Sequence, residues 1–433
     1  MPVVYVDNYR GFQETFIPLK SINFLVGENS TGKTSILKLI KALTDFKFWF
    51  AVDFDSEDTE LGYFSEIASY SNPNRKDFII GILGDGINKD NSINAIKMKF
   101  ISNEGIPTIS EMCFIEQGYN IQAQISERAI RYRYDKISIK NITEENKIEC
   151  FKTWIQKNGL KNKTYAEIEI REGISPRAYY YIQMLIFNKL KIEPKISFDK
   201  IPLFMRDIAW LAPIRTEPRR TYDRYNINFK PDGTHSPYLL KRILTDTKHK
   251  AYAKRVEGIL AKFGSDSGLF DNISINPLGK NDTSAFEILV SLEGNPIKIT
   301  SVGYGVSQIL PLIVEVISRP NESWFAIQQP EIHLHPRGQA AFGDFIYKSY
   351  QNEKKCFIIE THSDFIIDRY RLKLRDKKDK ESPIDSQVLF FDRVNGVNHL
   401  CCIKINADGS YDDNQPKEFR EFFIKEQLNL LKI

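Results

Sequence analysis

The stretch GENSTGKTS, from Gly27 to Ser35, has residue types and spacing that suit the binding of a nucleotide phosphate. It matches the pattern G-x-x-x-x-G-K-[ST], and it lies between a short apolar stretch and a segment with helical periodicity, as this pattern requires. In such a loop, backbone N–H groups and the helix N-terminus point at one place with partial positive charge, so they cradle phosphate oxygens. The alternative is a glycine-rich turn that caps a helix by chance.

The pattern assigns a role to each part of the loop. Gly27 and Gly32 permit a backbone conformation and a close approach that a side chain would block. We expect Lys33 to reach the β and γ phosphates of ATP, and the Thr34 hydroxyl to bind the accompanying Mg²⁺. The predicted nucleotide-binding residues are Gly27, Glu28, Asn29, Ser30, Thr31, Gly32, Lys33, Thr34 and Ser35.

A second polar group follows the apolar run Trp324–Ile327, in the segment IQQPEIHLHP. The run is typical of a central parallel strand, and open α/β sheets bind ligands at the carboxyl ends of such strands. Many ATPases keep two acids here, whereas this chain has Gln328 and Gln329, which form hydrogen bonds but carry no charge and cannot act as bases. Glu331 is the nearest carboxylate.

Two histidines in the same segment, His333 and His335, raise the alternative of a metal site. Histidines at positions i and i+2, with one carboxylate and no cysteine nearby, do not complete a zinc site. Pro336 indicates a turn directly after them, so we interpret both histidines as loop residues.

A third polar group, Glu360-Thr361-His362-Ser363-Asp364, follows the apolar run Cys356–Ile359. This run predicts a second strand that ends on the presumed nucleotide side. We therefore interpret His362 as a phosphate sensor, although a lone histidine is more often structural.

The segment SVGYGVSQILPLIVEVI, residues 301–317, predicts a further helix N-terminus. A strand of the preceding hairpin, FEILVSLEGNPIKI, is expected to end at Gly303, and an apolar helix follows. Glycines at this point allow a ligand to approach the first amides of the helix. A loop before an ordinary core helix is the alternative, because G-x-G turns are common there.

The order of expected elements is that of an α/β protein with an insertion. The first residues predict strand, loop and helix; residues 46–200 predict an antiparallel sheet, with strands in NAIKMKFI, EMCFIEQ and DKISIKNI, and then a helix in RAYYYIQMLIFNKLK. A helical block follows in SPYLLKRILTDTKHKAYAKRVEGILAKFG, and after the third polar group come a strand in QVLFFDR and a closing helix in the tail KEFREFFIKEQLNLLKI.

Composition sets wide bounds on the class of protein. The chain has 433 residues, of which 42% are hydrophobic, and its net charge of +4 does not by itself indicate a nucleic-acid partner. The five cysteines lack C-x-x-C spacing, which favours a reducing, cytoplasmic compartment. No apolar run approaches the roughly 18 residues needed to span a bilayer, so no membrane partner is expected.

Taken in order, these motifs resemble the ABC-type ATPase heads of SMC, RecF and OLD proteins. The matching segments are NYRGF (8–12), the phosphate loop (27–35), SVGYGVSQ (301–308), the run and loop at 324–336, and ETHSD (360–364). The resemblance is strongest to compact AAA ATPases of bacterial anti-phage defence systems, such as the ATPase subunit of the PARIS system. It implies an α/β P-loop NTPase fold: an ABC-type head with a mixed sheet (1–45 and 200–433) and an inserted antiparallel β and helical lobe (46–199).

The resemblance also implies a composite site in which two heads hold ATP between them, so at least a homodimer is expected. The signature residues that would contact the partner's nucleotide are Ser301, Gly303, Gly305, Ser307 and Gln308. His362 would act as the switch at the γ phosphate, and Arg10 and Phe12 would lie near the base or ribose. The catalytic set is Glu331, His362 and Gln329, with Thr34 and Gln328 as ligands of Mg²⁺.

The chain departs from the family pattern at two points. Gly303-Tyr304-Gly305 lacks the usual serine at its first position, which leaves Ser301 or Ser307 as substitutes. Because Gln328 and Gln329 replace the two acids, we expect Glu331 to supply the charge or the base, with Glu360 as a further carboxylate. Hydrolysis should therefore be slow rather than absent.

Three functional hypotheses follow from the resemblance. The first is an ATP-gated sensor or scaffold of anti-phage defence, which controls a separately encoded effector nuclease or toxin and responds to DNA or a phage protein. The second is a RecF- or SMC-like ATPase of DNA repair or maintenance. An OLD-type nuclease without its Toprim domain is less favoured, because only 71 residues follow His362.

Three basic stretches would suit DNA contact, because they combine arginine or lysine with tyrosine. They are RAIRYRYDK (128–136), RTEPRRTYDR (215–224) and RYRLKLRDKKDK (369–380). In the second stretch two prolines favour a fixed loop, and Arg215, Arg219 and Arg220 are the candidate contacts. A solvated charged surface is the alternative for each stretch.

Overall fold

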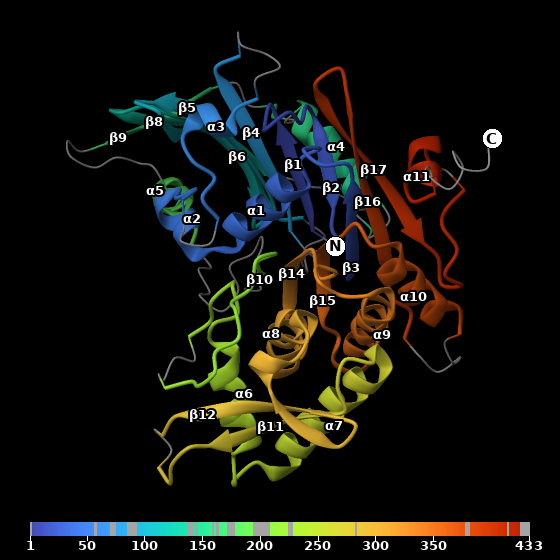
Figure 1. Ribbon diagram of the computed structural model, residues 1–433. Coiled ribbons are helices and arrows are strands. Elements are labelled where there is room, and N and C mark those ends of the chain that lie inside the picture. The colour runs from blue at the N-terminus through green and yellow to red at the C-terminus, as the bar shows by residue number, and fades with distance from the viewer. Residues whose placement is uncertain are drawn as a thin grey trace. The chain divides into compact units, whose positions relative to one another are not determined.

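The computed structural model describes residues 2–55, 59–69, 75–84, 93–136, 143, 146–157, 160–161, 164–170, 178–193, 208–223, 228–281, 284–376, 382–413 and 415–424 (Figure 1). The chain divides into two compact units. Unit 1 comprises residues 1–20, 28–207 and 390–402, and unit 2 comprises residues 21–27, 208–389 and 403–433. Residues 46–199, which we predicted as an inserted lobe, belong to unit 1 together with most of the phosphate loop.

Unit 1 contains an eight-stranded sheet of order β2-β1-β4-β5-β6-β7-β8-β9, in which the neighbouring strands pair antiparallel. Its strands are β1 (Val3–Asp7), β2 (Thr15–Pro18), β4 (Asp77–Leu83), β5 (Ala95–Asn103), β6 (Ile106–Glu116), β7 (Tyr119–Ile125), β8 (Ala129–Lys136) and β9 (Ala166–Glu169). The predicted antiparallel sheet is thus confirmed. Most of the strand predicted in DKISIKNI lies outside the described residues.

Strand β1 is buried throughout, and β4 and β6 end in runs of four and five buried residues, so this part of the sheet is covered on both faces. One core cluster joins Tyr5, Leu83 and Ile115 with Phe151 and Trp154 of helix α4 (Lys147–Lys157). The other helices of this unit are α1 (Lys33–Thr44), α2 (Phe46–Ala51), α3 (Phe64–Ile67) and α5 (Tyr179–Leu190). Helix α5 confirms the helix predicted in RAYYYIQMLIFNKLK.

Unit 2 is built around the six-stranded sheet β10-β14-β15-β3-β16-β17. Its strands are β3 (Ile22–Gly27), β10 (Ile208–Leu211), β14 (Trp324–Gln328), β15 (Cys356–Glu360), β16 (Ser386–Val394) and β17 (Val397–Ile405), and the outer parts of the last two belong to unit 1. The pairs β10/β14, β14/β15 and β15/β3 are parallel. Both predicted strands with polar ends, β14 and β15, are therefore confirmed as neighbours in a parallel sheet.

Helices and a small second sheet complete unit 2 (Figure 1). They are α6 (Ser236–Leu244), α7 (Lys250–Ser267), β11 (Asn272–Pro277), β12 (Phe286–Leu292), β13 (Asn295–Lys298), η1 (Ile299–Ser301), α8 (Tyr304–Ser318), α9 (Pro336–Glu353), α10 (Asp364–Arg375) and α11 (Lys417–Phe422). Helix α9 packs against α7 and α10, and α6 packs against α7 and α8. None of the helices in the described ranges is both long and apolar enough to cross a membrane.

One local prediction in unit 2 was wrong. We expected the hairpin strand to end at Gly303, but β13 ends at Lys298 and one 3₁₀ turn, η1, follows. Gly303 is the N-cap of α8. The segment from Val306 to Ile317 confirms the predicted core helix, because all its residues, including Ser307, Gln308 and Glu315, are buried.

Candidate functional site

The phosphate loop directly follows β3 and ends in the first turn of α1. Gly32, the N-cap of α1, has a φ of 94°, in the left-handed region that favours glycine. The Lys33 ammonium is buried and donates to the Glu28 carbonyl oxygen at 2.6 Å, and the Thr31 hydroxyl donates to the same oxygen at 2.8 Å. The loop is thus tied to its own backbone by two side-chain hydrogen bonds to one carbonyl oxygen.

The segment NYRGF contacts the phosphate loop and the start of α1. A Cβ atom on Gly32 would lie 2.5 Å from the ring of Phe12 and 2.8 Å from the Asn398 amide nitrogen. The Tyr9 hydroxyl donates to the Ser35 carbonyl oxygen at 2.9 Å, so it holds the start of α1. Glycine at position 32 is therefore required by packing as well as by its backbone conformation.

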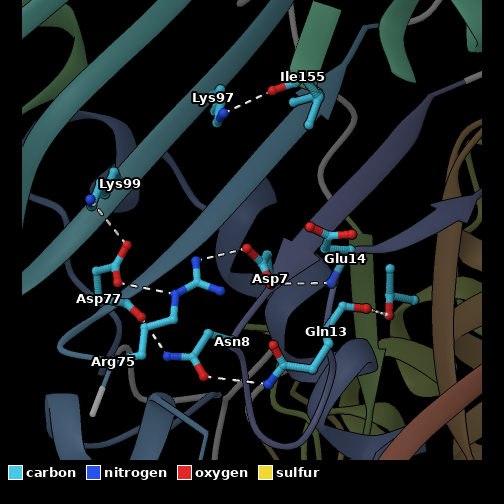
Figure 2. A network of polar contacts seen from close by, with 10 residues as sticks. Asp7, Asn8, Gln13, Glu14, Arg75, Asp77, Lys97, Lys99 and Ile155 are labelled. Atoms are coloured by element: carbon cyan, nitrogen blue, oxygen red, sulfur yellow. Dashed lines mark hydrogen bonds and ion pairs between the residues drawn. The ribbon is translucent and has the colours of Figure 1, made fainter. Parts of the chain in front are cut away.

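A network of charged residues fixes the strand from which this turn begins (Figure 2). Arg75 pairs with Asp7 at 2.7 Å and with Asp77 at 3.1 Å. The Asn8 amide donates to the Asp77 carbonyl oxygen at 2.5 Å, and the Gln13 amide donates to Asn8 at 3.5 Å. The residues on either side of the Tyr9–Phe12 turn, Asn8 and Gln13, are therefore joined by a hydrogen bond, and Asn8 is tied to the start of β4.

The predicted contacts of Arg10 and Phe12 with a base or ribose are wrong for this conformation. The Arg10 guanidinium donates to the carbonyl oxygens of Leu61, at 2.6 Å, and Glu66, at 3.1 Å. Phe12 is fully buried, and its ring meets Phe391 edge-on. Both residues stabilise the loop rather than face a ligand.

The polar ends of β14 and β15 meet in unit 2, where Gln328 lies opposite Glu360. The Gln328 amide donates to a Glu360 carboxylate oxygen at 3.0 Å, and both side chains are buried. The Gln329 N–H donates to the Glu360 carbonyl oxygen at 2.8 Å, and Gln329 has a φ of 43°. A carboxylate is therefore present at this strand end, on β15 rather than on β14.

Glu331 is bound on both of its carboxylate oxygens by the segment after β15. The Thr361 hydroxyl donates to one oxygen at 2.9 Å, and the His362 backbone N–H donates to the other at 2.7 Å. Burial raises the pKa of the Glu331 carboxyl above its ordinary value, and these two hydrogen bonds act in the opposite direction. The structure thus brings two predicted catalytic residues, Glu331 and His362, into direct contact.

Arg215 is a further member of this group, in a role that the sequence did not predict. The residue is 4% exposed, and its Nη2 atom donates to the carbonyl oxygens of Gln328, at 2.9 Å, and Gln329, at 3.4 Å. Its predicted contact with nucleic acid is therefore wrong, because a buried guanidinium cannot reach a phosphate backbone. Arg219 and Arg220, in the same loop, are exposed and stay candidates.

The signature residues differ in their exposure. Ser301 and Gly303 are exposed, whereas Gly305, Ser307 and Gln308 are buried in α8. A Cβ atom on Gly305 would lie 2.7 Å from the His333 carbonyl oxygen, and the Ser307 hydroxyl donates to the Tyr304 carbonyl oxygen at 2.7 Å. Ser301 and Gly303 are thus the accessible members of this segment, and the predicted contact of all five residues with a partner's nucleotide stays a prediction.

The two loop histidines have separate structural contacts. The His333 ring meets the Tyr304 ring edge-on, with centroids 4.8 Å apart. The His335 Nδ1 atom accepts the Gly338 N–H at 3.4 Å and so caps α9. The segment HLHP thus packs against the start of α8.

A cavity of about 580 Å³ also lies in unit 2, between α7 and α9. Ile259, Phe263 and Phe345 contribute apolar lining, and Lys348 and Glu353 contribute charges. None of the predicted site residues lines this cavity, so it is separate from the strand ends described above.

Comparisons with known proteins were made for the whole chain. The model of the AAA ATPase domain family matches residues 1–201 and 220–367. No curated protein sequence gives a significant match.

Among solved structures, the chain is similar to an SMC head bound to the C-winged-helix domain of ScpA, with 13% identity, 93% of this chain and 97% of that chain covered, and a TM-score of 0.42. It is also similar to the SMC head domain from Thermotoga maritima, with 10% identity, coverage of 92% and 97%, and a TM-score of 0.39. A Pyrococcus furiosus Smc head with an extended coiled coil has 11% identity, coverage of 100% and 99%, and a TM-score of 0.40.

Proposed function

The chain belongs to the AAA ATPase domain family, and we propose that within this family it works as a slow, nucleotide-gated ATPase switch. Membership makes it an ATP-binding α/β P-loop ATPase. The slow rate, the roles of individual residues and the biological process are our proposals.

ATP binds first, with its phosphates on the loop from Gly27 to Ser35. The amides at the start of α1 and the Lys33 ammonium neutralise phosphate charge. Thr34 and Gln328 would supply neutral oxygen ligands to Mg²⁺, which prefers oxygen donors. When bound, the ion would neutralise charge on the transferred phosphoryl group.

Glu331 then orients the attacking water and accepts its proton. The observation that carries this role is the fixed carboxylate, held by Thr361 and the His362 N–H beside two strand-end glutamines that cannot act as bases. His362 senses the γ phosphate, since its backbone bond to Glu331 links any movement of this segment to the catalytic carboxylate. Gln329 supplies an amide that orients the water without taking its proton.

Two chains assemble around ATP, as the resemblance to ABC-type heads implies. Ser301 and Gly303 are the exposed members of the signature segment, so they are the residues that would contact the partner's γ phosphate. The start of α8 supplies amide groups for this contact. ATP binding would therefore promote a homodimer or a larger assembly, and hydrolysis would release it.

In the cell, we place this switch in bacterial anti-phage defence, on the sequence resemblance alone. The assembled heads would sense DNA or a phage protein and control a separately encoded effector nuclease or toxin. A gene for such an effector next to the gene of this chain would support this role.

DNA repair or maintenance is the second candidate, and the surface of β8 favours it. The Arg131 and Arg133 guanidinium groups lie 5.6 Å and 5.0 Å from the Tyr165 ring centroid, so arginine and aromatic groups share this surface. Arg219 and Arg220 are exposed on a second surface. DNA binding that falls steeply as salt rises, and that weakens in a variant with Arg219→Ala and Arg220→Ala, would support this alternative.

The test of the proposed switch measures phosphate release and ATP-dependent assembly with purified protein. Lys33→Ala should abolish ATP binding, assembly and phosphate release together. Glu331→Gln should keep ATP binding and assembly but lower kcat by about 100-fold, as expected for loss of a general base. Lys38→Ala, on the same helix, and Glu257→Gln, on the exposed surface of α7, serve as matched controls.

Two results would contradict the proposal. Wild-type kcat in Glu331→Gln would remove Glu331 as the base. A monomer at saturating ATP, by sedimentation or light scattering, would remove the composite site.

A further inference from the structure

Arg215 is a buried cation with incomplete hydrogen bonding. It lies just after β10, which pairs in parallel with β14, so the loop carries its side chain beneath the end of β14. Nη2 donates to the carbonyl oxygens of Gln328 and Gln329, while Nε and Nη1 have no hydrogen-bond partner among the described residues. An incompletely bonded guanidinium is costly to bury, which makes a structural role alone a poor explanation.

The local charges indicate which group Arg215 acts on. Burial lowers the pKa of Arg215 to about 10, which still leaves it charged at neutral pH, and Glu331 is the carboxylate that opposes this shift. Arg215 in turn favours the ionised form of Glu331 against the effect of burial. The arginine therefore acts on Glu331 through its charge, and on the glutamine backbone through its hydrogen bonds.

We propose that Arg215 is the positioning residue for Glu331. Its guanidinium holds the carbonyl oxygens of Gln328 and Gln329, so the chain turns through Pro330 and presents Glu331 to Thr361 and His362. This inference rests on the proposed role of Glu331 in hydrolysis. It gives the loop APIRTEP a task in ATP turnover, in place of the nucleic-acid contact that we predicted for Arg215.

The backbone geometry supports a clamp at this point. Gln329 has a φ of 43°, a left-handed conformation that costs roughly 1–2 kcal/mol for a residue with a side chain. Two hydrogen bonds flank the strained residue: its N–H donates to the Glu360 carbonyl oxygen, and its own carbonyl accepts from Arg215. Removing the arginine takes away its bonds to both glutamine carbonyl oxygens and leaves the Ile332 N–H, at 3.3 Å, as the donor to the Gln329 carbonyl. We therefore expect Glu331 to lose part of its fixed orientation.

The test compares steady-state kcat and KM for ATP in the full chain with Arg215→Met, Arg215→Lys and Arg219→Met. Arg219 is exposed in the same loop, so its variant is the matched control. Arg215→Met should lower kcat by about 30-fold and change KM by less than about threefold, because a misplaced catalytic group costs up to about 100-fold in rate. Arg215→Lys keeps the charge, but its ammonium is carried on a flexible stem and lacks the planar, pre-organised fork of the guanidinium, so it should recover part of kcat.

A double variant distinguishes positioning from general destabilisation. If Arg215 acts through Glu331, then adding Arg215→Met to Glu331→Gln should lower kcat by less than about twofold, since residues that act as a unit are not additive. Multiplicative losses would overturn the inference, as would a rise in KM that parallels the fall in kcat. If Arg215→Met does not fold, the same double comparison with Arg215→Lys decides the question.

The same measurements separate this inference from the proposed function. Wild-type kcat in Glu331→Gln removes the catalytic role of Glu331 and the positioning role with it. A low kcat in Glu331→Gln beside wild-type kcat in Arg215→Met removes only the role of Arg215.

Discussion

The phosphate loop and the strand-end cluster, Gln328–Glu331 with Glu360–His362, contrast in how they depart from the family pattern. The loop keeps each expected residue. Packing limits which substitutions it can accept, because Phe12 leaves no room for a side chain at Gly32. The strand-end cluster has lost both expected acids, yet two carboxylates are present nearby on Glu331 and Glu360. Phosphate binding thus depends on one backbone conformation, whereas the proposed catalytic carboxylate can stand at different sequence positions in neighbouring segments.

This contrast reflects the physics of the two tasks. A phosphate loop must point several backbone amides at one place. Because few residue types adopt the required backbone conformation, the sequence of the loop can vary little. A proton acceptor needs only one carboxylate that hydrogen bonds hold in place, and parallel strands that end at the same edge offer several places for it. The predictions below test whether the two regions differ in this way.

Restoring an acid at the end of β14 should have the largest effect. Gln328→Asp would place a second carboxylate against Glu360, at a contact that is now a 3.0 Å hydrogen bond between buried groups. Two like charges in a buried site are strongly unfavourable, so we expect a loss of about 4 kcal/mol in the free energy of unfolding and no gain in kcat. Denaturant unfolding and phosphate release are the measurements.

The control for this change is Gln329→Glu, at a position that is only partly buried. Its loss of stability should be smaller. Faster turnover of Gln328→Asp without loss of stability would contradict the view that the charge has moved to β15 and Glu331.

A methyl group on the phosphate loop should have the next largest effect. Gly32→Ala forces a Cβ atom to within 2.5 Å of Phe12 at a φ of 94°, so the loop must shift, and we expect ATP affinity to fall by about 100-fold, or roughly 2.7 kcal/mol. Gly294→Ala is the matched control, because Gly294 has a φ of 79° but no atom within 4 Å of a Cβ. Equal ATP affinity in the Gly32→Ala and wild-type proteins, by calorimetry, would show that packing does not limit this loop.

The sequence predicted the parts of the fold that local pattern determines. Apolar runs predicted β14 and β15, and the glycine-rich pattern predicted the loop before α1, because a buried parallel strand and a phosphate loop each have strong local signatures. The same reasoning placed the hairpin end at Gly303 wrongly, since nothing local distinguishes one 3₁₀ turn from a longer strand.

The contacts of the site depended on burial, which the sequence does not show. Arg215 stands in a stretch with other arginines, so it was interpreted as part of a basic surface; its position after the apolar strand Ile208–Leu211 was the only signal for burial. Thr361 was within a recognised motif, but its bond to Glu331 joins residues 30 apart in the sequence. The role of Glu331 stays a prediction that Glu331→Gln tests, and the roles of His362 and Gln329 stay predictions as well.

Glu116 is a buried carboxylate outside both motifs. We expect its substitution to have a smaller effect on ATP turnover than the changes above. Burial raises the pKa of Glu116 in unit 1 to about 7, and the bond from the Tyr179 hydroxyl opposes this. Folding therefore favours the protonated acid: stability is full below the ordinary value of 4.5, falls as pH rises toward 7, and stays lower above it. Glu116→Gln should remove this fall, which we expect to be about 3 kcal/mol.

Denaturant unfolding between pH 4 and 8 checks this, and phosphate release at pH 7 is the control. Unchanged kcat in Glu116→Gln would separate a carboxylate that is only buried from one that is positioned for chemistry. A kcat that falls as far as in Glu331→Gln would show that burial alone does not distinguish the two sites.

The pH dependence of kcat should show the smallest effect and the most specific one. The proposed role of Glu331 as base requires its ionised form, and burial raises the pKa of this carboxyl above its ordinary value of 4.5, so kcat should fall on acidification at a pH above 4.5. Thr361→Val removes one of the two hydrogen bonds that favour the ionised form, so the acid limb should move to higher pH while kcat at pH 8 falls by less than about tenfold. Thr245→Val, an exposed threonine at the end of α6, should leave the profile unchanged. An acid limb that moves equally in both variants, or in neither, would mean that the group titrating in kcat is not the carboxylate held by Thr361 and His362.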